Sequence, residues 1–297
     1  MTEQHKARYT WGGDEFLLVE VEEDMSLQAN FTVHGMAAAL EAKKLDGLVD
    51  IAPGNAALLI RFNPDVIAPA ELESIVKSLE DELRSTPPGV VQTRVIEVPV
   101  WFEDPFTKET MTRFREGFHQ TPDGDDVEYG AQVNNLSSKE EFLRRYYESP
   151  WIVSMVGFVA GLPFLYQLVE RDQQLVVPKY LSPRTDTPEL TLGHGGCFGA
   201  IYAVRGAGGY QMMGILPAPI YQPEMTLPDF TEFSVLFKPG DIVKYRPIDE
   251  TEYYSIKKEC EAGTYKYKEI PFAFDMGASL ADPAAYNKKI VEALNGA

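Results

Sequence analysis

The pattern of apolar and polar positions in the first 95 residues alternates between strand and helix periods. Runs typical of β-strands occur at 8–10, 16–21, 48–51, 57–62 and 91–100. Between them, a 3.6-residue apolar repeat predicts one helix capped by Ser26 and a second, more amphipathic helix that begins at Pro69. The order ββαββαβ predicts a two-layer α/β sandwich over residues 1–95, in which two helices cover one face of a small sheet.

A different pattern begins at residue 96, where glycine, proline, aromatic and β-branched residues become frequent. Many short apolar runs between 151 and 248 alternate with turns, which favours a closed or nearly closed β-barrel over residues 96–250. A helical insertion is expected at about 103–150, where Ser137 and Glu140 form an S-x-x-E capping box. Residues 251–297 are expected to form a C-terminal extension that ends in a short helix, and the fold class is α+β.

Charge and cysteine content narrow the possible partners. The chain has 45 acidic and 27 basic side chains, a formal charge of −18, so it repels phosphate backbones and anionic membranes. Cys197 and Cys260 allow at most one internal disulfide and provide no paired metal-ligand pattern. No run approaches the roughly 18 to 20 apolar residues that span a bilayer. We therefore expect a cytoplasmic protein without nucleic-acid or membrane partners.

Two glycine-dense segments, 190–199 and 205–214, stand out as candidate ligand-binding turns. The first contains Gly195, and the second contains Gly208 and Gly209 followed by Tyr210 and Gln211. Glycines at this density allow backbone N–H groups to approach a ligand closely, so the segments can form a cradle for an anion or a carbonyl. Two tight barrel turns without a ligand explain the same pattern.

A proline-stiffened stretch at 177–188 carries two cations, Lys179 and Arg184. Fixed cations can bind a carboxylate or a ureido oxygen, and an arginine can do so through two parallel hydrogen bonds. An ordinary solvated loop is the other interpretation of this stretch.

The four histidines offer one candidate for acid–base chemistry. His194 lies between glycines and can serve as a general base near neutral pH or as a turn residue with a structural hydrogen bond. His34 is expected to pack, whereas His5 and His119 are expected at the surface. The histidines and cysteines lack close ligand spacing, so no metal site is predicted.

Several motifs follow one another in order along the second half of the chain: 157–165, the pair Pro183 and Arg184, Pro188, 208–211 and 239–241. Together they resemble the allophanate hydrolase subunit 1 family. This family includes the B subunit of 5-oxoprolinase, a sporulation kinase inhibitor and a carboxyltransferase segment of urea carboxylase. The resemblance implies an N-terminal α+β domain followed by a cyclophilin-like β-barrel, and the insertion near 103–150 is most similar to urea carboxylase. One loop departs from the urea carboxylase pattern, which has an acidic residue there. Residues 158–160 of this chain are Phe-Val-Ala, whose side chains cannot accept hydrogen bonds from urea.

The resemblance implies a subunit of a biotin-dependent carboxyltransferase that moves a carboxyl group from carboxybiotin to a small amide-like acceptor. Biotin would be carried on a separate chain or domain, because the sequence has no Ala-Met-Lys-Met motif. The implied partners are an allophanate hydrolase subunit 2 homologue, a biotin carboxylase and a biotin carrier protein. In this scheme Lys179 or Arg184, with backbone near Gly195 and Gly208, stabilises charge, and His194 is the base. Gly209, Tyr210 and Gln211 bind or orient the ligand.

Two other functions follow from different members of the same family. One is the B subunit of an ATP-dependent 5-oxoprolinase or a related cyclic amide hydrolase, which would need no biotin. The other is a non-enzymatic, kinase-inhibitor-like binding protein.

Overall fold

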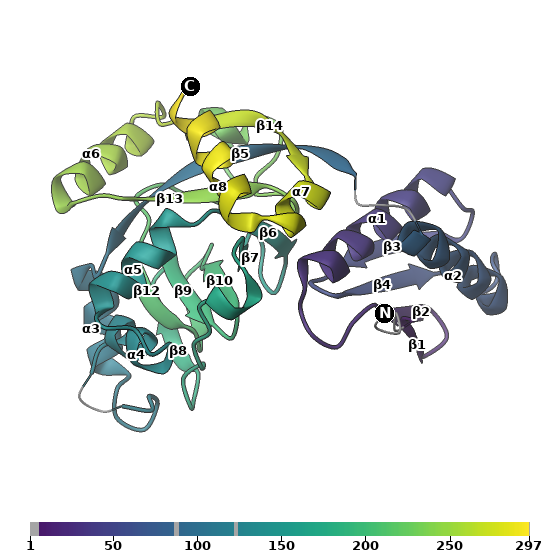
Figure 1. The fold of residues 1–297 in the computed structure, drawn as a ribbon, viewed down its shortest axis with the longest axis horizontal. Coiled ribbons are helices and arrows are strands. Elements are labelled where there is room, and N and C mark those ends of the chain that lie inside the picture. The colour runs from purple at the N-terminus through teal and green to yellow at the C-terminus, as the bar shows by residue number, and fades with distance from the viewer. Residues whose placement is uncertain (1–5, 86–88, 122–123, 297) are drawn as a thin grey trace. The chain divides into compact units, whose positions relative to one another are not determined.

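The computed structural model describes residues 6–85, 89–121 and 124–296, which fall into two compact units, Met1–Gly89 and Val90–Ala297 (Figure 1). Each unit has its own apolar core. We therefore describe each unit separately.

The first unit is a four-stranded antiparallel sheet with two helices packed on it (Figure 1). The strand order is β1-β2-β4-β3, with β1 at Arg8–Gly12, β2 at Phe16–Glu20, β3 at Leu48–Pro53 and β4 at Ala57–Phe62. The helices are α1, Leu27–Lys43, and α2, Pro69–Ser85. Ser26 caps α1 by accepting a hydrogen bond from the Ala29 N–H at 3.0 Å, as the sequence predicts. Alternation along β4 buries Leu58, Ile60 and Phe62 under the helices.

The second unit is built on an eight-stranded sheet of order β12-β9-β10-β7-β6-β13-β5-β14. The strands are β5 Val90–Phe102, β6 Trp151–Val156, β7 Pro163–Gln167, β9 Thr191–Gly195, β10 Phe198–Ile201, β12 Gln211–Ile215, β13 Ile242–Pro247 and β14 Glu269–Asp275. Strand β12 pairs with β5 as well, through Gly214 opposite Phe102, so the pairing returns to an earlier strand. A side chain at Gly214 would lie 2.5 Å from the Trp101 carbonyl oxygen, and glycine therefore permits this junction.

Strand β5 corrects one expectation from the sequence. The alternating pattern predicts this segment as the last element of ββαββαβ in the first unit. Instead it pairs in parallel with β13 and antiparallel with β14 and β12, within the second unit's sheet. Alternation of apolar and polar residues indicates a strand but does not say which strands pair with it, because a strand in any sheet with one buried face shows the same alternation.

Helices connect and extend this sheet. The insertion between β5 and β6 contains α3 Pro105–Arg113, α4 Asp126–Val133 and α5 Lys139–Glu148. The cap of α5 is Ser138, which accepts from the Glu141 N–H at 3.2 Å, one residue after the predicted Ser137. Short 3₁₀ turns lie at Arg171–Gln173 and Pro228–Phe230, and a small ribbon pairs β8, Arg184–Thr187, with β11, Gly206–Gly208.

The C-terminal segment contributes to the large sheet. It contains α6 Glu250–Glu261, strand β14, α7 Met276–Ala281 and α8 Pro283–Asn295. Helices α7 and α8 pack on β5 and β14 (Figure 1). Among the residues described, no helix is both long and apolar enough to span a membrane.

Candidate functional site

A cavity of about 330 Å³ in the second unit, which we call the aromatic pocket, brings several predicted site residues together. Its lining is Phe158, Leu162, Phe164, Lys179, Tyr180, Pro183, Ala200, Tyr202, Gly208, Gly209 and Tyr210. Lys179, Gly208, Gly209 and Tyr210 are candidate site residues on sequence grounds as well. The volume and aromatic walls are those of a small-molecule site.

Lys179 is exposed and supplies the single charged side chain of this lining among the described residues. Its Nζ lies 5.2 Å from the centre of the Tyr210 ring, within the range of a cation–π contact. The Tyr180 N–H donates to the Gly209 carbonyl at 2.7 Å, which ties the cationic loop to the glycine turn. The structure thus brings the predicted loop and the second glycine turn together at one cavity.

The glycines allow tyrosine rings to pack directly against the backbone. A side chain at Gly208 would lie 2.3 Å from the Tyr202 hydroxyl, and one at Gly195 would lie 2.4 Å from the Tyr210 ring. Gly195 itself does not line the cavity but lies behind Tyr210. Close packing therefore accounts for part of the glycine density in both segments.

Arg184 is fully buried on β8, which corrects the expectation of an exposed loop cation. Its guanidinium carbon lies 4.4 Å from the centre of the Tyr180 ring, and its Nε donates to Thr187 Oγ1 at 3.3 Å. Neither terminal nitrogen makes a hydrogen bond of normal geometry within the described part of the chain. Burial raises the pKa of Tyr202, and the nearby Arg184 cation partly offsets that effect. Arg184 therefore lies as a buried cation next to two tyrosines of the pocket wall.

Asp126 holds the Tyr180 wall in place from behind. The carboxylate is 1% exposed and accepts hydrogen bonds from the Tyr180 hydroxyl at 2.8 Å, Arg115 Nη1 at 3.1 Å and the Met212 N–H at 2.8 Å. Burial raises the pKa of Asp126, whereas the hydrogen bonds from Met212 and Tyr180 oppose the shift. No local pattern of residues signals this role, because the partners of Asp126 are distant along the chain.

His119 and Gln211 form a second buried pair beside Asp126. His119 Nε2 donates to Gln211 Oε1 at 2.8 Å, and its Nδ1 accepts from the Thr121 N–H at 2.9 Å. Gln211 Nε2 donates to the Pro178 carbonyl at 2.8 Å. His119 is thus buried and not at the surface as expected. Gln211, predicted to orient a ligand, has both ends of its amide engaged inside the protein and fixes the loop that carries Lys179.

His194 occupies the core of the second unit. Its Nε2 lies 3.0 Å from the Leu175 carbonyl and 3.1 Å from that of Gly196, and its Nδ1 faces the Tyr146 hydroxyl at 3.3 Å. Burial lowers the pKa of His194 to about 4. The ring is fully buried and lines neither described cavity. A general base must reach the proton it removes, so this geometry supports the structural interpretation of His194.

Lowering the pH should destabilise the protein, because His194 is buried in its neutral form. Because its folded pKa lies below the unfolded value of about 6.5, its stabilisation is complete above pH 6.5 and is lost as pH falls toward 4. We expect the free energy of unfolding to fall by about 3 kcal/mol more in the parent than in His194→Gln between pH 7 and pH 4. Urea unfolding at both pH values measures this, and parallel pH profiles for the two proteins would contradict it.

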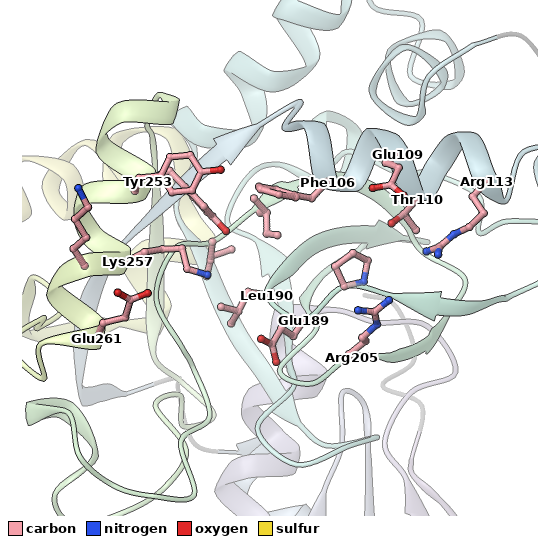
Figure 2. Close-up of a pocket in the computed structure, with 15 residues that line it drawn as sticks. Phe106, Glu109, Thr110, Arg113, Glu189, Leu190, Arg205, Tyr253, Lys257 and Glu261 are labelled. Carbon is pink, nitrogen blue, oxygen red and sulfur yellow. The ribbon is translucent and has the colours of Figure 1, made fainter.

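A second cavity of about 730 Å³ lies between α3 and α6, and none of the predicted site residues lines it (Figure 2). Phe106 and Tyr253 face each other across it with ring centres 6.1 Å apart. The charged residues of its lining have both signs. Two of them, Arg113 and Arg205, both pair with Asp186 at 2.7 Å. Within the described ranges, no group of three or more His, Cys, Asp or Glu side chains could hold a metal ion.

The second unit is a mixed α/β fold with a large sheet and an aromatic pocket, and sequence comparison gives the family. Residues 7–231 match the family model described as carboxyltransferase domain, subdomain C and D, and the chain belongs to this family.

Individual relatives fall into two groups by length. The chain is 27% identical to the B subunit of 5-oxoprolinase from Bacillus subtilis over 83% of this chain and 95% of that protein. It is 26% identical to Saccharomyces cerevisiae urea amidolyase, covering 91% of this chain but only 15% of the much longer relative. The crystal structure of Kluyveromyces lactis urea carboxylase matches with a TM-score of 0.83 at 23% identity, over 100% of this chain and 26% of that one. At this identity the structural match concerns the fold.

Proposed function

We propose that this chain is a subunit of a biotin-dependent carboxyltransferase, which transfers a carboxyl group from carboxybiotin to a small amide-like acceptor and needs a partner chain to act. The observation that carries the proposal is the aromatic pocket, with Lys179 in its lining and the Arg184 cation behind its tyrosine wall. Membership of the carboxyltransferase-domain family and similarity to urea amidolyase support it.

The residues present fit a biotin ring system. A volume of about 330 Å³ accommodates a small bicycle, and Phe164, Tyr202 and Tyr210 offer apolar faces for it. Arg184 Nη1 and Nη2 are buried without a hydrogen bond of normal geometry in the described chain, and this cation beside Tyr180 and Tyr202 would favour a negatively polarised group near the pocket. Carboxybiotin, when bound, supplies the activated carboxyl group.

The chain's own residues then have defined tasks. Lys179 holds positive charge in the pocket lining and stabilises an oxygen that gains negative charge beside it. Aromatic residues make up much of the remaining lining, while the Lys179 side chain stays accessible to a ligand from solvent. Asp126 holds Tyr180, and Gln211 holds the Pro178 carbonyl next to Lys179. The base that activates the acceptor comes from another residue than His194, and we assign it to the partner chain.

We further propose that the large sheet is a closed barrel of the cyclophilin-like type. The additional pairing of β12 with β5 supports closure, because it links the first and seventh strands of the sheet order. This arrangement would remove the edge at β12 and leave β14 as the remaining edge strand of the sheet.

Native complexes provide the test of this proposal. We expect co-expression with a subunit 2 homologue to give one joint peak in size-exclusion chromatography, and mass spectrometry of the native complex to find a biotinylated carrier and a biotin carboxylase. Separate peaks from two well-folded chains would refute the partner requirement. A complex without any biotinylated chain would refute biotin dependence.

The length match to the B subunit of 5-oxoprolinase supports a second candidate, ATP-dependent hydrolysis of a cyclic amide. The composition of the purified complex and an assay of ADP release distinguish the two functions. Under the second candidate the complex lacks biotin, and it releases ADP only when a cyclic amide is added.

A further inference from the structure

Phe158 combines a strained backbone with an exposed ring at the aromatic pocket. Its φ is +71°, in the left-handed region that bulky residues rarely adopt, and its side chain is 77% exposed while lining the cavity. It lies in the turn between β6 and β7, which the Gly157 N–H closes by donating to the Leu162 carbonyl at 3.0 Å. Strain of this kind persists where the surrounding structure imposes it, often at ligand sites.

The turn is anchored on its other side, so the ring of Phe158 is held at the pocket. A side chain at Gly161 would lie 2.7 Å from Tyr221 Cβ, which shows how closely the backbone packs there. Folding alone gives no reason for phenylalanine at 158, because glycine or asparagine suits the backbone better and an exposed ring contributes little burial. The exposed ring is therefore available to contact a ligand in the pocket.

We propose that Phe158 is the specificity-determining residue of the aromatic pocket and that it selects a flat cyclic urea or cyclic amide over acyclic urea. This inference rests on the proposed function. With Phe164 and Tyr210, Phe158 lines the cavity with aromatic rings, which pack well on a flat ring, whereas acyclic urea offers little apolar area for such packing. The ring could belong to biotin itself or to a cyclic acceptor, because both present the same planar amide chemistry.

The test compares two variants that relieve the same backbone strain. Phe158→Asn removes the ring at the pocket, whereas Met225→Asn removes a side chain with φ +52° and 37% exposure that does not line the pocket. Binding of biotin, 2-pyrrolidone and urea to the full chain is measured by ligand-observed NMR titration, and the thermal midpoint is recorded for each protein. We expect Phe158→Asn to weaken at least one ring probe about tenfold, with urea unaffected and the midpoint unchanged or higher. Met225→Asn should leave all binding unchanged.

The outcomes separate this inference from the proposed function. Weakened biotin binding identifies the cofactor ring as the selected ligand, and weakened 2-pyrrolidone binding identifies the acceptor; either result supports the role of Phe158. Equal binding of the ring probes to parent and Phe158→Asn overturns that role but leaves the pocket assignment standing. A lower thermal midpoint, or equal loss of urea binding, shows a structural role and also overturns it. If the parent binds neither ring probe, the pocket assignment fails and the inference fails with it.

Discussion

Lys179→Ala should lower the rate of carboxyl transfer by about 100- to 1,000-fold, the range seen when one preorganised oxyanion-stabilising group is removed. Lys179 is the single charged residue of the described pocket lining, and its Nζ lies 5.2 Å from the centre of the Tyr210 ring. The free energy of unfolding should change by no more than about 0.5 kcal/mol, because the side chain is exposed. Transfer of labelled carboxyl from carboxybiotin, measured in the complex with its partner chains, gives the rate.

A matched control is Lys288→Ala on α8, an exposed lysine that lines neither described cavity. Its transfer rate should equal that of the parent. Parent-like turnover by Lys179→Ala would remove this lysine from the site, and an equal loss in Lys288→Ala would point to a general effect of charge.

Asp126→Ala should destabilise the second unit by about 3–5 kcal/mol, the cost of removing one partner from a buried charged network. Three polar groups donate to this carboxylate, so its removal leaves the Tyr180 hydroxyl, Arg115 and the Met212 N–H without this acceptor. Urea unfolding followed by near-ultraviolet circular dichroism reports this loss, because the affected tyrosines lie in the second unit.

Asp186→Ala provides the comparison for this prediction. Asp186 also accepts from two arginines, Arg113 and Arg205, but all three side chains are partly exposed to solvent. Its removal should cost clearly less, since solvent screens ion pairs at the surface and solvates the arginines that remain. Equal losses in the two variants would show that burial does not set the contribution of Asp126.

Part of the site was predictable from residue type. A lysine in a proline-stiffened loop and glycines beside a tyrosine are local features, and Lys179, Gly208, Gly209 and Tyr210 indeed line one cavity. Phe158 stands out in the sequence only as a departure from the urea carboxylase pattern. Its left-handed backbone, which suggests a role in specificity, is visible only in the folded turn.

Other predicted site residues could be judged only from their burial, which residue type alone does not predict. Arg184, His194 and Gln211 have the chemistry of site residues, but the fold places all three in the interior. His119 was expected at the surface, yet it bonds to Gln211, 92 positions away. A polar residue enters a core when partners from distant segments satisfy it, and those partners are known only once the chain has folded.

The sequence by itself determined the helices and strands of the first unit, because apolar periodicity and the Ser26 cap act over a few residues. It also indicated the family, through motifs that follow one another in order between residues 157 and 241, and the family model matches residues 7–231. Only the tertiary structure decided that β5 joins the larger sheet and that the C-terminal segment adds β14 beside it. Only the tertiary structure, too, placed Asp126 behind Tyr180 and Arg184 against its ring. Strand pairing and buried polar contacts form between segments far apart in the chain, and no local pattern of residues encodes which segments will meet.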